Sequence, residues 1–189
     1  MNPNFRNAIC LCMAVILASV LPVMAQDALL TFEDPFEVSS VKTDNTSVSR
    51  VDVDGKAALE FVTEKAKYPG VTLRPASGKW DAGDAIGIAV ELKNKSANRV
   101  DVHGRVDNPG PWKTSAHNSN RKALGPGKSG VLKVYFAKNY GQDAKLAVDG
   151  TNIKQLLIFV AGAKGGEAVQ ILSVKTIPAS EATSTASTS

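Results

Sequence analysis

Apolar and polar side chains alternate with a period of two over most of the chain from Leu29 to Pro178. This period is typical of β-strands that bury one face, whereas an amphipathic helix repeats every 3.6 residues. Apart from a short turn near 151–154, no stretch of a dozen residues carries a helical stripe. The pattern predicts about ten short strands. The clearest of them cover residues 47–53, 57–63, 71–73, 86–92, 100–106, 131–136, 153–160 and 168–177.

Turn residues separate these segments. Asp54-Gly55 divides the first two strands, and glycine takes the positive φ that a tight hairpin turn requires. Further turn clusters lie at 93–98, 108–111, 125–127 and 162–166. Short strands with one apolar face predict an all-β fold, an antiparallel two-sheet β-sandwich of jelly-roll type.

The N-terminal segment differs from the rest of the chain. An apolar run over Ala8–Leu21 follows a single positive charge, and Val23 and Ala25 fit the small-residue pattern before a secretory cleavage site. The run is shorter than the about 20 apolar residues of a membrane-spanning helix. We therefore expect residues 1–25 to be a cleaved signal peptide. The protein would then be secreted or periplasmic, with no membrane attachment after cleavage.

The C-terminal segment also stands apart. Residues 179–189 are nearly all Ala, Ser and Thr and have little side-chain bulk to bury, which indicates a flexible tail. The folded domain is expected at 26–178. Both cysteines, Cys10 and Cys12, lie in the expected signal peptide, so neither disulfides nor zinc–thiolate sites are expected in that domain.

The charge of the chain narrows the class of partner. It carries 22 Lys and Arg against 18 Asp and Glu, a net charge of +4. The basic residues are dispersed, without the basic stripe and interleaved aromatic residues of a nucleic-acid-binding protein. We expect no nucleic-acid partner, although the mild surplus favours acidic polymers such as sulfated polysaccharides.

Catalytic motifs are missing from the sequence. Neither of the two histidines sits in a nucleophile-elbow context, and no Gly-x-Ser-x-Gly occurs. A glycosidase needs two carboxylates that flank the scissile bond. The nearest candidate pairs lie at or near turns and lack an aromatic lining: Asp52 with Asp54, and Glu60 with Glu64. We expect no enzymatic activity and no cofactor.

The most informative segment is Arg99–Trp112. In a strand of period two its valines face the core, and four polar side chains share the opposite face: Asp101, His103, Arg105 and Asp107. Such groups, with Asn108 just beyond them, can each bond two vicinal sugar hydroxyls. The indole of Trp112 offers a sugar ring an apolar platform, and the small residues Gly87 and Ala89 of the preceding strand would leave room. The alternative is a solvated strand face with a ladder of charges.

Other residues have simpler interpretations. Tyr140 lies on a loop from which its ring could reach a ligand, so it joins the candidate site. Trp80 is expected at the edge of the core and Tyr135 on the outside of its strand. His117 is expected on the surface, within a long polar loop over 111–121.

Several segments, in order, carry a resemblance to a known family: Tyr68-Pro69-Gly70-Val71, Trp80-Asp81, Ala85–Asn94 and Arg105-Val106-Asp107-Asn108-Pro109-Gly110. A Pro126-Gly127 turn and an Ile153–Phe159 strand follow. Together they resemble the agarase carbohydrate-binding-like domain, the N-terminal β-sandwich of secreted β-agarases and related algal-galactan hydrolases. The resemblance spans roughly 29–177, and the strand pattern supports the same fold.

The resemblance implies a galactan ligand of agarose or porphyran type, and it allows a glycoside hydrolase as a partner. The enzymes continue into a catalytic barrel whereas this sequence ends at Ser189, so their activity does not carry over. Family sandwiches often hold a structural calcium between an Asp-Asn pair and an acidic residue of the first strand. Leu172 and Ser173 occupy the positions of that pair here, facing Glu33 and Asp34. Calcium requires several oxygen ligands, so this set is a poor match.

We interpret the chain as an exported, non-catalytic carbohydrate-binding module. Two other interpretations stay open: a structural or interaction domain that docks on a partner glycoside hydrolase, and the truncated N-terminal domain of an agarase. An exposed apolar patch would favour docking. A groove lined by the polar row and Trp112 would favour sugar.

Overall fold

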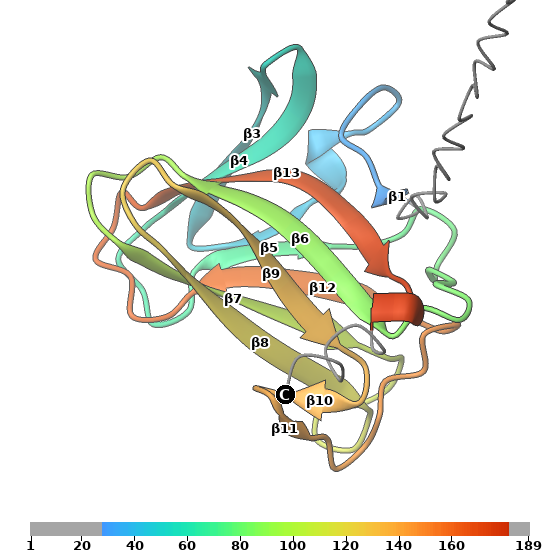
Figure 1. Cartoon of the computed structure of the whole chain (residues 1–189). Coiled ribbons are helices and arrows are strands. Elements are labelled where there is room, and N and C mark those ends of the chain that lie inside the picture. Colours follow the sequence, from blue (N-terminus) through green and yellow to red (C-terminus); the bar gives the residue numbers. More distant parts are fainter. Residues whose placement is uncertain (1–27, 182–189) are drawn as a thin grey trace, which may run out of the picture.

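Each strand presents one apolar face, and two sheets bury these faces against each other. The computed structural model describes residues 28–181, which form two antiparallel sheets (Figure 1). Sheet A contains, in spatial order, β3 (Thr46–Val53), β4 (Lys56–Thr63), β13 (Ala168–Ile177), β6 (Gly87–Asn94) and β9 (Ser129–Tyr135), with β1 (Ala28–Leu30) paired to β13. Sheet B contains β2 (Lys42–Asp44), β5 (Gly70–Leu73), β12 (Gln155–Val160), β7 (Val100–Asp107) and β8 (His117–Leu124). A hairpin of β10 (Lys138–Asn139) and β11 (Gln142–Asp143) and the 3-10 turn η1 (Val38–Ser40) complete the elements.

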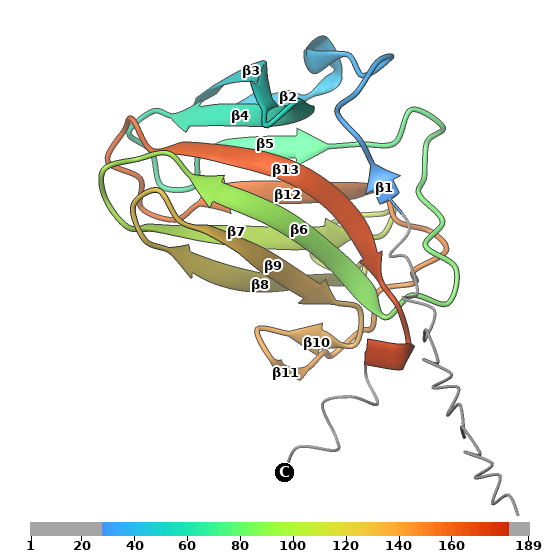
Figure 2. The same cartoon turned by 45° about the horizontal axis from the view of Figure 1, so that its top comes forward.

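The path of the chain is that of a jelly roll. The strands β4, β5, β6 and β7 alternate between sheet A and sheet B. Later in the chain β9 and β13 return to sheet A, and β8 and β12 to sheet B. The order β4-β13-β6-β9 therefore faces β5-β12-β7-β8 across the core (Figure 2). The predicted antiparallel two-sheet sandwich of jelly-roll type is confirmed.

This path contradicts the expected role of Gly87 and Ala89. Both lie in β6, which pairs with β13 and β9 in sheet A, whereas the polar row lies on β7 in sheet B. The two small residues thus cannot leave room beside that row. The prediction treated strands adjacent in the sequence as neighbours in one sheet, and the jelly-roll path places them in opposite sheets.

The core fills the space between the sheets. Its fully buried large side chains include Leu59, Phe61, Ile88, Leu92 and Ile171 from sheet A, and Leu73, Leu156 and Ile158 from sheet B. Trp80 is 8% exposed and forms a β-bridge with Ile153 at the edge of this core, as predicted. Tyr135 is partly exposed between two buried neighbours, which confirms that it faces outward.

The predicted first hairpin is present. β3 pairs with β4 through a turn in which Asp54 has φ 54° and Gly55 has φ 78°. Two consecutive positive φ values match the right-handed twist of paired strands. The backbone N–H of Gly55 also donates to Oδ1 of Asp52 at 3.0 Å, which holds the turn closed.

Strand β8 is the main element that the apolar pattern did not predict. Its inward positions carry Asn118 and Asn120 in place of apolar residues. Asn118 Nδ2 donates to the carbonyl oxygen of Phe136, and Asn120 Nδ2 donates to that of Lys133 at 2.7 Å. We call Asn118 and Asn120 the asparagine seam, because they join β8, the edge of sheet B, to β9, the edge of sheet A. The expectation of a loop is thus wrong from His117 onward.

The two ends of the chain fall largely outside this description. The predicted signal peptide lies outside the described residues, and so do residues 182–189 of the predicted tail. Residues 179–181 form a short turn against β9, where Glu181 Oε1 accepts hydrogen bonds from Lys133 Nζ at 2.5 Å and from Tyr135 Oη at 3.2 Å. Over residues 28–181 there is no helix with the length and apolar character needed to cross a membrane.

Replacing Asn118 by Ala should lower the free energy of unfolding by ~1–3 kcal/mol, because a buried side chain and its hydrogen bond to the Phe136 carbonyl are lost, and that carbonyl keeps only the Val148 N–H as a donor. Denaturant unfolding followed by tryptophan fluorescence measures the change. Asn98→Ala is the matched control, since that side chain is exposed and should change the same quantity by no more than ~0.5 kcal/mol. Equal effects of the two substitutions would contradict the role of the asparagine seam.

Candidate functional site

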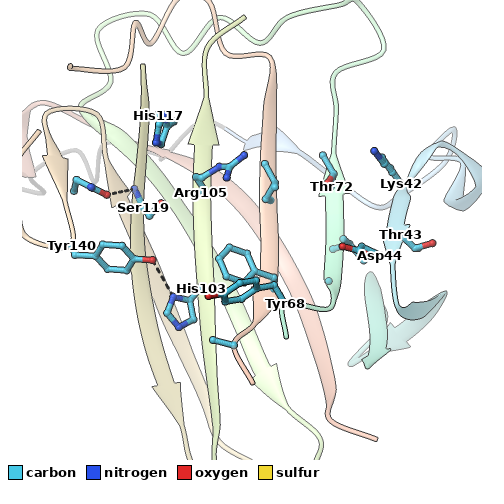
Figure 3. A pocket seen from close by; sticks show the side chains of 16 residues that line it. Lys42, Thr43, Asp44, Tyr68, Thr72, His103, Arg105, His117, Ser119 and Tyr140 are labelled. Carbon is cyan, nitrogen blue, oxygen red and sulfur yellow. Dashed lines mark hydrogen bonds between the residues drawn. The ribbon is translucent and has the colours of Figure 1, made fainter. Parts of the chain in front are cut away.

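An open groove of about 900 Å³ crosses the outer face of sheet B (Figure 3). The alternation within β7 explains its position. Val102, Gly104 and Val106 are buried toward the core, so His103 and Arg105 project from the opposite face. The groove is lined by residues from all five strands of the sheet and from the β10–β11 hairpin.

Strand register places the lining residues in two parallel rows. One row begins at Arg121, beside the groove, and runs across the sheet through the lining residues His103, Phe159, Gly70 and Asp44. The next runs through Ser119, Arg105, Leu157, Thr72 and Lys42. With five strands about 4.8 Å apart, each row extends over about 19 Å. The groove is therefore long enough for several consecutive units of an extended polymer.

Aromatic rings follow the first of these rows. The His103 imidazole stacks on Phe159, with ring centres 5.2 Å apart and an angle of 17°. The ring of Tyr68 lies edge-on to that of Phe159 with ring centres 5.9 Å apart, and the ring of Tyr140 lies edge-on to that of His103 at 6.0 Å. We call Tyr140, His103, Phe159 and Tyr68 the aromatic row. Both tyrosines are about half exposed, at 48% and 54%, so their rings are open to a ligand.

Glycine at position 70 lets β12 lie close to β5 beside the aromatic row. A Cβ there would lie 2.2 Å from the carbonyl oxygen of Ile158 and 2.6 Å from Cα and Cβ of Phe159. Any side chain would displace the backbone of β12 or the Phe159 ring. Gly70 and Thr72 are thus the small residues that lie beside the outward row of sheet B, whereas Gly87 and Ala89 lie in sheet A.

The ring of Tyr140 is held in place by its hairpin. Tyr140 and Gly141 connect β10 to β11 with φ values of 49° and 81°, the turn geometry of a tight hairpin. The backbone N–H of Tyr140 donates to the Ser119 carbonyl at 2.7 Å, and Asn139 Oδ1 accepts from the Ser119 N–H at 3.0 Å. The Tyr140 hydroxyl lies 3.2 Å from His103 Nδ1 (Figure 3). Tyr140 is thus fixed at one end of the aromatic row.

Arg105 is fixed by a buried carboxylate. Its Nε donates to Asp107 Oδ1 at 2.7 Å and its Nη2 to Asp107 Oδ2 at 2.8 Å. Gln155 Nε2 donates to the same Oδ2 at 2.7 Å, and Asp107 is only 7% exposed. A two-point contact of this kind sets the plane of the guanidinium. Asp107 bonds Nε and Nη2, so the Nη1 hydrogens can be donated to a ligand in the groove. Asp107 itself does not line the groove and acts by positioning Arg105.

The other predicted residues lie outside the main groove. Asp101 is paired with Arg99 at 3.6 Å. Asn108 uses both ends of its amide on the 149–152 turn: Nδ2 donates to two carbonyl oxygens there at 2.9 and 2.7 Å, and Oδ1 accepts from the Asp149 N–H at 2.8 Å. The structure therefore brings His103, Arg105 and Tyr140 together but gives Asn108 a contact within the fold.

Trp112 lines a separate, small depression of about 60 Å³. Its ring is 64% exposed and lies 6.4 Å from the ring of His117. Arg105 and His117 line both this depression and the main groove. Trp112 therefore lies next to the groove, on the far side of Arg105, and is not part of the aromatic row.

Phe159 and Tyr68 are the residues that sequence reasoning missed. Within the 153–160 strand, Ile158 and Val160 face the core, so the alternation already places Leu157 and Phe159 on the outside. Apolar side chains at outward strand positions are a signal for a binding surface. The prediction concentrated on the polar row of the next strand in the sheet and overlooked this one. His117 and Ser119 also line the groove, although the sequence predicts a loop at this part of β8.

The groove contains few charged groups that could carry out catalysis. Asp44 is the single carboxylate among its lining residues, whereas glycoside hydrolysis uses two. Within residues 28–181 no group of three or more His, Cys, Asp and Glu side chains could hold a metal ion. Around the suggested calcium position, Asp34 accepts from Arg50 Nη1 at 2.6 Å, and Ser173 bonds Glu91 at 3.2 Å.

Comparisons by sequence give no match, either to a protein-family model or to a curated protein. Comparison of structures gives clear neighbours. An exo-β-agarase matches with a TM-score of 0.64 and 13% identity over 80% of this chain and 25% of the agarase. A family 11 carbohydrate-binding module from Clostridium thermocellum, solved with a β-1,3-1,4-mixed-linked tetrasaccharide, matches with a TM-score of 0.59 and 15% identity over 79% of this chain and 95% of the module.

A further neighbour is CBM28, a carbohydrate-binding module specific for non-crystalline cellulose, with a TM-score of 0.55, 14% identity, and coverage of 83% of this chain and 99% of the module. The chain has the fold of carbohydrate-binding β-sandwich modules. It spans 25% of the agarase and nearly the whole of both modules. The resemblance to the agarase sandwich, inferred from short motifs, is thereby confirmed at the level of the fold.

Burial lowers the pKa of the His103 imidazole below its ordinary value of 6.5, and the positive charge of Arg121 lowers it further, against the opposing effect of Asp101. NMR titration of the imidazole protons, assigned by comparison with His103→Asn, should therefore give a midpoint below 6.5. The folded chain binds this proton more weakly than the unfolded chain does. The stability that the neutral His103 contributes is therefore fully present at pH values above the pKa of the unfolded chain. It should decline as the pH falls toward the folded pKa. A midpoint above the ordinary value would contradict the burial of His103 against Phe159.

Proposed function

We propose that the chain binds an extended polysaccharide along the groove of sheet B without cleaving it. The observation that carries this proposal is the aromatic row beside a fixed arginine. Both lie on the outer face of sheet B, whose inner face packs in the core. Sugar rings present apolar C–H faces and polar edges, and aromatic side chains with adjacent hydrogen-bonding groups complement both. The groove combines these two surfaces over a length suited to several sugar residues.

The individual roles follow from position. Tyr140 and Tyr68, at the ends of the aromatic row, offer exposed rings on which sugars stack. His103 and Phe159 form the floor between them. Arg105 donates from Nη1 to sugar oxygens, while Ser119 and Thr72 on the same row add hydroxyl groups. Asp107 and Asn108 act indirectly, the first by holding Arg105 and the second by holding the 149–152 turn.

The proposed ligand is an algal galactan of agarose or porphyran type. Support comes from the motif resemblance and from the agarases among the structural neighbours. Trp112 would extend the binding surface past Arg105, so that a longer chain contacts it after leaving the groove. The single lining carboxylate supports a non-catalytic role. A secreted or periplasmic location, expected from residues 1–25, would bring the protein to such a polymer.

Phe159→Ala and Arg105→Ala should each raise the dissociation constant for a soluble galactan about tenfold or more, since each removes a central contact. Affinity electrophoresis in native gels containing the polysaccharide measures this. Val131→Ala is the matched control, because that exposed apolar side chain lies on sheet A, away from the groove. Thermal unfolding of each variant separates a loss of binding from a loss of fold.

The same gels show whether the ligand binds in the groove or in the small depression beside Trp112. Loss of binding on Trp112→Ala, with Phe159→Ala unaffected, would move the site to the small depression and overturn the groove assignment. If the intact chain binds no galactan at all, docking on a partner glycoside hydrolase becomes the leading interpretation.

A further inference from the structure

Positive side chains predominate around the groove. Four of them line it or border it: Lys42, Lys67, Arg105 and Arg121. Lys42 and Arg105 line the groove, and Arg121 lies opposite His103 on β8. The Lys67 ammonium stands 5.2 Å from the centre of the Tyr68 ring. Among the described residues Lys42, Lys67 and Arg121 have no ion-pair partner.

Fewer negative charges oppose them. Asp44 lines the groove two residues from Lys42 on the same strand. Asp107 is committed to Arg105 and nearly buried. Asp101 lies outside the groove and pairs with Arg99. Because Asp107 compensates Arg105 and Asp101 compensates Arg99, the excess of positive charge along the site comes from Lys42, Lys67 and Arg121, with Asp44 alone opposing them among the described lining residues.

The spacing of these cations identifies the kind of ligand. Lys42 and Arg105 stand on one row, three strand intervals or about 14 Å apart. Arg121 and Lys67 flank the aromatic row toward its two ends. A single small anion reaches only one of these groups, whereas a polymer with a charge on successive units reaches several. Guanidinium groups bind tetrahedral oxyanions through paired hydrogen bonds, and an ammonium acts as a point charge.

We infer that the groove selects an anionic polysaccharide, a galactan that carries sulfate esters, over the neutral polymer of the same backbone. This inference rests on the proposed function and names its ligand class more closely. The aromatic row would bind the sugar rings that both polymers share. The four cations would bind the sulfate groups that only one of them carries.

The test compares a sulfated algal galactan with its own chemically desulfated product, by calorimetry on the full chain. At an ionic strength of about 0.1 M the sulfated polymer should bind about tenfold more tightly. At about 1 M the preference should largely disappear, because the Debye length shrinks from about 10 Å to about 3 Å.

Matched variants assign the effect to the groove. The combined change Lys42→Gln, Lys67→Gln and Arg121→Gln should remove most of the preference. The combined change Lys56→Gln, Lys93→Gln and Lys175→Gln removes the same charge from sheet A and should preserve it. Equal losses in the two triple variants would overturn the inference, because the preference would then follow net charge alone.

The remaining outcomes separate this inference from the proposed function. If both polymers bind equally and Phe159→Ala weakens both, the groove binds galactan and the charge selection is wrong. If neither polymer binds, the proposed function fails as well. If the sulfated polymer binds but Phe159→Ala has no effect, binding is simple ion exchange, and both proposals are overturned.

Discussion

The strict alternation of side chains in β7 and β12 is the constraint on which the site depends. Val102 and Val106 from one strand, with Leu156 and Ile158 from the other, are the side chains that sheet B buries in the core against sheet A. The same period then places His103, Arg105 and Phe159 on the outer face, with Phe159 opposite His103. Core and groove are therefore two faces of the same two strands, and a shift of one residue would exchange them.

Preorganisation distinguishes this face from a solvated ladder of charges. The guanidinium of Arg105 is held at two points by Asp107, which is itself bonded by Gln155. The ring of Tyr140 is held by a tight hairpin turn that is bonded to β8. Side chains that are already ordered lose little freedom when a ligand arrives. The asparagine seam serves the same end, because it fixes the edge strand from which Ser119 and Arg121 project.

Regular apolar periodicity made most of the fold predictable from the sequence, and its absence explains what was missed. The hairpin at Asp54-Gly55 and the long closing strand follow from turn chemistry and alternation alone. Strand β8 could not be predicted in this way, because its inward positions carry amides whose partners are carbonyl groups at β9 in the opposite sheet. His103, Arg105 and Tyr140 were found from one polar strand and one loop. The outward position of Phe159 follows from the alternation of its own strand, but its place between residues 70 and 103, with Tyr68 beside it, required the strand order.

The location of the ligand is the central claim, and NMR mapping tests it most directly. A soluble galactan oligosaccharide would be titrated into isotope-labelled protein while the backbone amide shifts are followed. We expect the largest changes at Gly70, His103, Arg105, Tyr140 and Phe159, with the outer face of sheet A unchanged. Changes confined to sheet A, or none at saturating sugar, would contradict a binding groove on sheet B.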